Sequence, residues 1–519
     1  MSHDDGILAH LLLKCGQKVG PAVTNTPSET HPRRIYPLDA HQLSEEQIAV
    51  TFAMTSRRPE PFDQIAEQVS QEKAADFHER WVLGYGHASV AEHAVVHLAV
   101  ENISRLACDT LEDNRLASYT EKSSRYQLLP RGYYFVPEEL AGNPDLAGLY
   151  RQTCDHLFQC YHRLVDGCME HLREVGPQRE GERESAYTMR LRRKATDNCR
   201  AVLPAATLTN VGMTANARVL EHAISKLLSS ELSEERQLGE ELREQGRKIT
   251  PTLIKYADDN LYLRGVTRQQ YRLSQELALL QNGAHRTVKP ERRRENVHEG
   301  SAPIIVRLLD WDQQAEEKLA TALLYRQSVA SYDEIWRRVL TMDAEERREI
   351  IDSCVSKLGP HDAPVREFEL VEYTFEFLMD YGAYREFKRH RMQSYIPQPP
   401  TVAHGYTTPV LIADAGLAGE YREALDSSTH AYQRVYEYSP QAAPYLVTHA
   451  HYRRVLARMN LRECYHLFKL RTSKLAHFSI RGPMLEAMKL TVGTHPQLFR
   501  YLRLRDYPVW WPFSQSEGS

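Results

Sequence analysis

Apolar and polar positions along the chain predict a mainly helical protein with a few strands. Apolar residues recur with the 3.6-residue period of an amphipathic helix from Ser44 to about Gln71, over 146–175 and over 216–280. At 91–111 an apolar-rich run begins as a strand, "AVVHLAV", and continues as a helix, "ISRLACDTL". Helical periodicity dominates again in the second half of the chain. Together these patterns predict an α+β fold in which long helices surround mixed or antiparallel sheets.

Polar segments between these patterns divide the chain. Residues 20–40 are rich in Pro, Thr and Ser, and 282–300 is polar and strongly basic. A chain of 519 residues is too long for one ordinary core, and two domains of roughly 200–250 residues are expected. We therefore predict an N-terminal arm at 1–43, a first domain at 44–281, a basic linker at 282–300 and a second domain at 301–519.

Composition narrows the class of protein. The net charge is -4 with 26% charged residues, so no global field attracts nucleic acid. No apolar run approaches the roughly 20 residues that span a bilayer. The N-terminal stretch places acidic residues before a short apolar run, which is not typical of a signal peptide. The eight cysteines show no C-x-x-C pair, which favours reduced thiols and no metal site. We expect a cytoplasmic protein without nucleic-acid or membrane partners.

The two halves of the sequence repeat each other weakly. The first half contains "EEQIAVTFAMTSR", then "GHASVAEH", then "NRLASYTEKSSRY", then "NARVLEHAISKLL". The second half contains "EEKLATALLYRQS", "GPHDAPVREFE", "RHRMQSYIPQPP" and "NLRECYHLFKL" in the same order. A period close to half the chain indicates duplication of a whole domain rather than a solenoid.

These segments resemble the motifs of the flavin-dependent thymidylate synthases. That family has an upstream G-H-x-x-x-x-E-H segment, then R-H-R followed by Ser, Glu, Ser, Arg and Tyr, and later an N-x-R helix with a further Arg. The resemblance covers roughly 45–260 and 302–490. It implies a tandem-duplicated, divergent member that binds FAD and transfers a one-carbon unit from methylenetetrahydrofolate to C5 of dUMP, with NADPH as reductant.

The N-terminal half keeps the nucleotide-binding part of the family pattern. The cofactor-binding residues implied by the resemblance are His87, in the glycine-histidine segment, and the N-x-R pair Asn216 and Arg218. The triplet itself reads Asp113, Asn114, Arg115, and the later activating arginine falls on Leu227. The residues implied to bind the substrate are Glu121, Ser123, Arg125 and Arg200.

The C-terminal half departs in the opposite places. It lacks the Glu-x-Ser-x-Arg tail, and the position that matches Arg200 falls near Pro444. Arg471 occupies the place of the activating arginine and is the implied catalytic residue. The implied cofactor-binding residues are His361, Arg389, His390, Arg391, Asn460, Arg462 and His466. Each half has therefore lost what the other has kept.

The residue types suit the chemistry that the resemblance implies. A flavin dinucleotide carries a pyrophosphate, and the reduced ring is negative near N1, so arginine forks can bind both with charge-assisted hydrogen bonds. Arg389, His390 and Arg391 would face the flavin. Arg471 would stabilise negative charge on the pyrimidine as C5 becomes nucleophilic.

Structural interpretations of the same residues stay open. His87 and His93 are also compatible with helix caps or core positions, and an Arg-His-Arg cluster with a solvated face or an ion-pair hub. The favoured function is dTMP formation. The alternatives are a flavoenzyme for a different pyrimidine nucleotide and a non-catalytic flavin- or nucleotide-binding scaffold with decayed sites.

The complementary losses also predict an assembly. Two duplicated chains provide four domains, which would make a homodimer that acts as a pseudo-tetramer. One kind of interface would then combine Ser123, Arg125 and Arg200 of an N-terminal half with Arg389, His390 and Arg471 of a C-terminal half. This composite site predicts about one flavin per chain rather than two.

Overall fold

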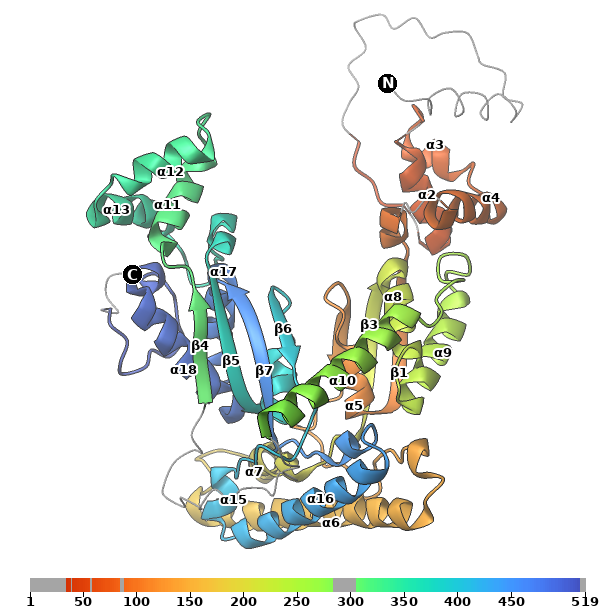
Figure 1. The fold of residues 1–519 in the computed structure, drawn as a ribbon, viewed down its shortest axis with the longest axis vertical. Coiled ribbons are helices and arrows are strands. Elements are labelled where there is room, and N and C mark those ends of the chain that lie inside the picture. Colours follow the sequence, from red (N-terminus) through yellow and green to blue (C-terminus); the bar gives the residue numbers. More distant parts are fainter. Residues whose placement is uncertain (1–33, 39, 57, 85–87, 283–304, 514–519) are drawn as a thin grey trace, which may run out of the picture. The chain divides into compact units, whose positions relative to one another are not determined.

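The computed structural model describes residues 34–38, 40–56, 58–84, 88–282 and 305–513 (Figure 1). The chain divides into two units, Met1–Leu43 and Ser44–Ser519, and every element described below belongs to the second. Most of the predicted N-terminal arm, and the predicted linker beyond Asn282, lie outside the described residues. Among the residues that are described, no helix has both the length and the apolar character that a membrane span requires.

The N-terminal half alternates helices with three strands. Among the described residues, three α-helices, a π-helix and a 3-10 helix precede its first strand. Its elements are α2 (Glu45–Met54), α3 (Phe62–Ala66), α4 (Gln71–Phe77), the π-helix (His78–Gly84), 3-10 helices (Ala88–His93, Glu138–Leu140, Arg200–Val202), β1 (Val95–Ser104), α5 (Arg105–Leu111), β2 (Ser118–Glu121), α6 (Pro144–Val175), α7 (Glu184–Cys199), β3 (Leu208–Asn216), α8 (Ala217–Leu228), α9 (Ser233–Arg247) and α10 (Leu261–Asn282).

The C-terminal half has a similar order with one additional strand. Its elements are β4 (Ile305–Trp311), α11 (Ala315–Tyr325), α12 (Tyr332–Leu340), α13 (Ala344–Val355), 3-10 helices (Arg366–Leu370, Ala443–Leu446), β5 (Glu372–Asp380), α14 (Tyr381–Phe387), β6 (Gln393–Pro397), α15 (Val410–Asp414), α16 (Ala418–Tyr438), β7 (Tyr452–Asn460), α17 (Leu461–Arg471), α18 (Phe478–Thr494) and α19 (Pro496–Phe499).

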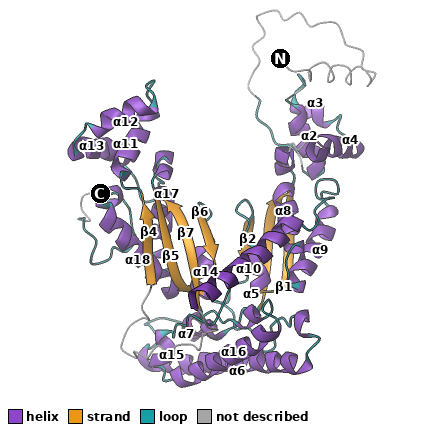
Figure 2. Ribbon diagram, in the orientation of Figure 1, coloured by secondary structure: helices purple, strands orange, loops and turns teal. Residues whose placement is uncertain are grey.

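Each half contains one antiparallel sheet, visible in Figure 2. The strand orders are β1-β3-β2 and β4-β5-β7-β6, so β5, β7 and β6 correspond to β1, β3 and β2. The register agrees with this correspondence, because Ser118 pairs with Thr214 in the first sheet and Ser394 pairs with Arg458 in the second. The predicted α+β class and the tandem arrangement are confirmed.

Matching N-caps fix where each strand passes into a helix. Ser104 and Asp380 accept a backbone N–H at the start of α5 and α14, respectively. Asn216 and Asn460 do the same at the start of α8 and α17. Such caps satisfy amide groups that the first turn of a helix leaves unpaired. Residues counted from these caps are therefore equivalent in the two halves.

A local twofold relation connects the halves. The Ala205 N–H donates to the Val447 carbonyl at 2.8 Å, and the His449 N–H donates to the Leu203 carbonyl at 3.0 Å. Exchanging the halves turns the first bond into the second, because Leu203 corresponds to Val447 and Ala205 to His449. Pro204 and Thr448, which are also equivalent, bridge each other directly. The pseudo-twofold axis passes between these two segments.

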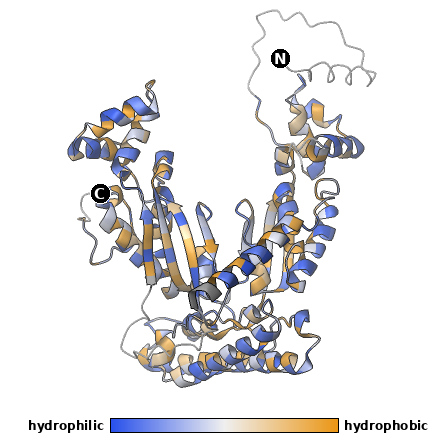
Figure 3. Cartoon of the chain, viewed as in Figure 1, coloured by the Kyte–Doolittle hydropathy of each residue, from blue (hydrophilic) through white to orange (hydrophobic). Residues whose placement is uncertain are grey.

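The hydrophobic core is shared between the halves. One buried cluster joins Tyr150 of α6 to Phe375 of β5 and Phe468 of α17, and another joins α6 to Tyr421 of α16. The helices α6 and α16 lie side by side, and Figure 3 shows hydrophobic and hydrophilic positions alternating along both, as expected for helices with one buried face. Because Ser44–Ser519 form a single compact unit, the boundary between the two predicted domains stays a prediction.

The predicted elements agree with the structure where the apolar period is uninterrupted. The strand-to-helix passage within 91–111 and the long helix at 146–175 are confirmed as β1, α5 and α6. The helical period over 216–280 corresponds to α8, α9 and α10, which are separated by breaks. Ser44 to Gln71 is likewise interrupted: Pro61 caps α3, and its ring cannot continue a helix.

Candidate functional site

Glu121, the last residue of β2, is a buried carboxylate at the contact between the halves. It accepts hydrogen bonds from Arg105 Nη1 at 2.8 Å, from Thr209 Oγ1 at 3.1 Å and from Arg389 Nη2 at 3.2 Å, and it also accepts one from Arg385. Burial would raise the pKa of Glu121, but Arg385 and Arg105 hold it well below the usual range. Arginines of both halves therefore pair with Glu121, for which the sequence predicted a contact with the substrate.

A second buried ion cluster lies at the same contact. Lys388 Nζ is 2.6 Å from Asp109 Oδ1, and Arg453 Nη1 is 3.1 Å from Asp109 Oδ2. Counted from the N-caps, Asp109 of α5 corresponds to Arg385 of α14, and the C-cap residue Glu112 corresponds to the C-cap residue Lys388. Equivalent positions thus carry opposite charge, and Asp109 forms ion pairs with two cations of the other half.

Arg125 and Arg200 of the N-terminal half gather around Asp197, near the end of α7. Arg125 donates from Nε and Nη2 to the two Asp197 oxygens at 2.8 and 3.0 Å, and Arg200 Nε lies 3.5 Å from Oδ1. His477 Nε2 donates to the Asp197 carbonyl at 3.1 Å. Burial and the neighbouring Arg200 lower the pKa of His477 to about 3, so its ring is neutral. Ser123 Oγ accepts the Arg125 N–H at 3.2 Å and orders the loop.

Glu386 of α14 connects this group to the C-terminal half. One carboxylate oxygen lies 3.5 Å from Arg200 Nη2, and the other accepts from Arg471 Nη1 at 2.9 Å. Burial would raise the pKa of Glu386, but the charges of Arg200 and Arg471 lower it. Arg200 and Arg471, which the sequence assigned to different halves, therefore converge on one side chain within a single chain.

His390 and Glu463 fix the orientation of Arg471. His390 Nδ1 donates to Glu463 Oε1 at 3.0 Å, and its Nε2 accepts from Arg471 Nε at 3.0 Å. Burial lowers the pKa of His390, which agrees with a neutral ring that carries its proton on Nδ1. His390 is only 5% exposed, so it supports Arg471 from behind and does not line the pocket described next.

Arg389 and Arg391 face a pocket at the pseudo-twofold contact. Arg115 of the divergent triplet in the N-terminal half faces the same pocket, so the two triplets meet there. Arg391 is exposed and makes no ion pair or hydrogen bond with the described residues, which leaves its guanidinium available to a ligand. The residues lining the pocket are Glu112, Asp113, Asn114, Arg115, Tyr119, Lys388, Arg389, Arg391 and Tyr395.

The three residues of the first triplet, Asp113, Asn114 and Arg115, form hydrogen bonds within the protein. Asp113 Oδ1 accepts from the Tyr395 hydroxyl at 2.7 Å, and Asn114 Nδ2 donates to the Leu111 carbonyl at 2.8 Å. Arg115 Nη2 donates to Ser394 Oγ at 3.2 Å. Two of these three bonds cross between the halves, so the divergent triplet now stabilises the contact.

The two N-x-R pairs differ in what their arginines contact. Asn216 and Asn460 both act as N-caps. Arg218 forms an exposed ion pair with Glu92 of the glycine-histidine segment. Arg462 donates to the Pro364 carbonyl at 2.8 Å and to Glu369 at 2.7 Å, and so ties down the segment that contains His361.

The remaining predicted histidines are dispersed. His361 is exposed, and His466 of α17 is exposed with its ring centroid 5.5 Å from that of His390. His87 lies outside the described residues. None of the contacts in the described part of the chain joins His361 to the arginine group.

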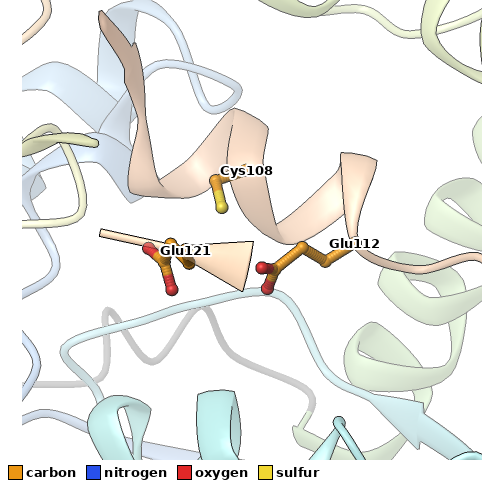
Figure 4. A group of neighbouring side chains, drawn as sticks. All are labelled: Cys108, Glu112 and Glu121. Atoms are coloured by element: carbon orange, nitrogen blue, oxygen red, sulfur yellow. The ribbon is translucent and has the colours of Figure 1, made fainter. Parts of the chain in front are cut away.

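Cys108, Glu112 and Glu121 form a group of one thiol and two carboxyl groups (Figure 4), with potential ligand atoms within 4.8 Å of one another. Burial raises the pKa of the Cys108 thiol, and burial together with Glu121 raises the pKa of Glu112. Metals require deprotonated ligands, and Glu121 is already paired with arginines. The group therefore belongs to the ion network between the halves.

Sequence reasoning did not identify the acidic partners of the arginines. Asp197 lies three positions before its partner Arg200, so an acidic residue at helical spacing from a predicted binding arginine was an available signal. Glu386 had no such signal, because its partners Arg200 and Arg471 are distant in the sequence. His477 and Glu463 carried no comparable signal, because only the packing of α18 and α17 brings them to the site.

Comparison with known proteins follows this geometry. The sequence profile of the family described as thymidylate synthase complementing protein matches residues 38–252 and 307–497. A UPF0159 protein of Chlamydia muridarum is 30% identical over 446 residues, which are 84% of this chain and 82% of the relative. A UPF0159 protein of Thermoplasma acidophilum is 28% identical over 473 residues, or 85% and 91% of the two chains. A flavin-dependent thymidylate synthase of Clostridium tetani is 26% identical over 214 residues, which are 41% of this chain and 82% of that protein.

Proposed function

Because this chain belongs to the thymidylate synthase complementing protein family, we propose that it is a flavin-dependent enzyme that forms dTMP from dUMP. Methylenetetrahydrofolate would donate the one-carbon unit to C5, and NADPH would be the reductant. The observation that carries this proposal is the convergence of Arg125 and Arg200 with Arg471 around Asp197 and Glu386.

The arginine group fits a nucleoside monophosphate. A phosphate needs several donors in fixed geometry, and guanidinium groups supply them in pairs. Arg125 and Arg200 are held by carboxylates that an incoming phosphate would replace as acceptors. Ser123 and Ser124 lie beside them and add hydroxyl groups.

Arg471 would act on the pyrimidine ring. Its Nε is fixed by His390 and one Nη by Glu386, so its orientation is set before a ligand arrives. A preorganised donor stabilises the negative charge that develops when C5 becomes nucleophilic, because it needs no reorganisation at that moment. After the new carbon–carbon bond has formed, C5 would lose its proton to solvent water.

We assign FAD to the pocket at the pseudo-twofold contact. Arg115, Arg389 and Arg391 suit a pyrophosphate, and the rings of Tyr119 and Tyr395 suit a flat aromatic system. When bound, the flavin would carry the hydride from NADPH that converts the transferred one-carbon unit into a methyl group. The acids Glu112 and Asp113 at the same pocket would disfavour a ligand that is negatively charged throughout.

We further propose that two chains associate as a homodimer in which 44–281 and 301–519 act as four domains of a pseudo-tetramer. The predicted arm at 1–43 and linker at 282–300 would flank these domains. Reduced cysteines and a nucleotide substrate are compatible with a cytoplasmic protein.

Tritium release from labelled pyrimidine nucleotides, together with ligand binding, tests the proposed function. Tritium release from C5-labelled dUMP, with methylenetetrahydrofolate and NADPH, should depend on all three substrates. Release from a different labelled pyrimidine nucleotide alone would favour the first alternative enzyme. Flavin and nucleotide binding without release from any labelled pyrimidine would favour a non-catalytic scaffold.

The cofactor is tested separately. The purified protein should release FAD on denaturation, and the double variant R389A/R391A should lose it, because two of the three arginines at the pocket are removed. A matched control is R337A/R338A, which removes two exposed arginines at the end of α12. Full flavin retention by R389A/R391A, or equal loss in the control, would refute the cofactor assignment.

A further inference from the structure

The pseudo-twofold relation implies a second position equivalent to the arginine group. Counting from the matching caps and from the reciprocal backbone bonds, Pro444 corresponds to Arg200 and Leu227 to Arg471. Thr110 corresponds to Glu386, and Leu232, the N-cap residue of α9, corresponds to His477, the N-cap residue of α18. The counterparts of Arg200 and Arg471 are therefore uncharged.

Buried carboxyl groups occupy this second position. Glu234 accepts from the Ser104 N–H at 2.7 Å, from Ser104 Oγ at 2.6 Å and from the Tyr445 hydroxyl at 2.7 Å. Glu235 accepts from Thr110 Oγ1 at 2.5 Å. Glu234 and Glu235 are each 5% exposed and Tyr445 is fully buried, so side chains of both halves fill the space.

Further acidic groups surround these two residues. Glu139 accepts the Ser233 N–H at 2.6 Å, and its other carboxylate oxygen is buried without a partner. Lys226, the cation that acts on Glu235, has its Nζ bonded to the Asp113 carbonyl at 2.8 Å. Burial raises the pKa values of Glu234 and Glu235, which is the response of carboxyl groups that lack a guanidinium partner.

The two equivalent positions therefore have opposite electrostatics. At the first, three guanidinium groups meet the two carboxylates of Asp197 and Glu386. At the second, Glu139, Glu234 and Glu235 meet hydroxyl and backbone donors. An anion brought to the second position would lose its hydration without gaining a paired cation, and an unpaired buried charge is costly.

We propose that this second position is a closed acidic contact that excludes nucleotides, so that each chain has one nucleotide site, at Arg125, Arg200 and Arg471. This inference rests on the proposed function for the identity of the ligand. The duplicated chain has thus converted one of two equivalent sites into a structural connection between its halves, through Glu234 and Tyr445.

Equilibrium dialysis of the full-length protein against radiolabelled dUMP measures the stoichiometry directly. We expect saturation at about one dUMP per chain. Two dUMP per chain would overturn this inference and leave the proposed function standing. No binding at all would overturn both, so the two failures are distinguishable.

Variants locate the bound nucleotide. R471L places at the first position the leucine found at the second, and it should lower the amount of dUMP bound per chain, because one of the three guanidinium groups is removed. E235Q changes a residue of the second position isosterically and should keep the stoichiometry of the unmodified protein. If R471L kept its nucleotide, or if E235Q lost it with an unchanged unfolding midpoint, the assignment of the two positions would be wrong. Should R471L fail to fold, R200M tests the same arginine group.

Discussion

Replacing Glu121 by Gln should destabilise the contact between the halves more than any exposed ion pair can. The Glu121 side chain is 4% exposed, and its partners Arg105 and Arg385 are 3% and 7% exposed. Removing one partner of a buried ion pair leaves uncompensated charge and typically costs about 3–5 kcal/mol. Arg389 is 51% exposed and adds little to this cost. We therefore expect E121Q to lose about 3–5 kcal/mol of unfolding free energy at neutral pH.

Urea unfolding followed by tryptophan fluorescence measures this loss, and pH gives an independent check. Because the folded-state pKa of Glu121 is lowered, its contribution is present above its ordinary value of 4.5 and is lost as pH falls through the folded-state value. The difference in unfolding free energy between the unmodified protein and E121Q should accordingly become smaller as pH falls below 4.5.

An exposed ion pair provides the matched control. Glu276 pairs with Arg272 on α10 with both side chains more than half exposed, and E276Q should cost about 0–1 kcal/mol. If E121Q cost no more than E276Q, or if its cost did not change with pH, the buried ion network would not stabilise this contact.

Three further results are expected. R471A should reduce tritium release from dUMP about 100- to 1000-fold while flavin stays bound, because one preorganised donor is lost. L227A should cost about 2–4 kcal/mol of stability, measured in urea, because Leu227 is fully buried, and should leave turnover unchanged; equal activity losses in R471A and L227A would contradict this asymmetry. The pKa of His477 is lowered to about 3 from 6.5, so stability should fall as pH drops from 6.5 towards 3, and H477N should flatten that part of the pH–stability curve. A slope unchanged in H477N would assign the effect to other groups.

The asymmetry between the halves has a common structural cause. In a symmetric pair of domains each position meets its own copy or one equivalent neighbour, so a change on one side is repeated on the other. In this chain the halves differ. Asp109 can therefore pair with Lys388 and Arg453, while the equivalent position in the other half is Arg385 and not a second acid. The same freedom allows Arg471 at one position and Leu227 at the other.

The fold class and the tandem arrangement could be predicted from the sequence alone, because both depend on patterns that the chain carries locally. The apolar periodicity predicted α6 and the passage from β1 to α5, because an element that buries one face must repeat its apolar residues with the period of that element. The order of motifs in the two halves predicted equivalent elements, which the caps Asn216 and Asn460 confirm. The helix breaks between α8, α9 and α10 were missed, because breaks between helices that continue the same apolar period leave little local signal.

Which charged groups contact each other depends on the packing of the two halves. Nothing in the local sequence links Glu386 to Arg200, or Glu121 to Arg385, because these partners are brought together by the packing of the two halves around their pseudo-twofold axis. For the same reason the sequence grouped His390 with Arg389 and Arg391, whereas the turn after α14 directs His390 inward to Glu463. Side-chain direction and long-range pairing depend on the whole fold, and the free energy of a buried charge depends on the partners found there.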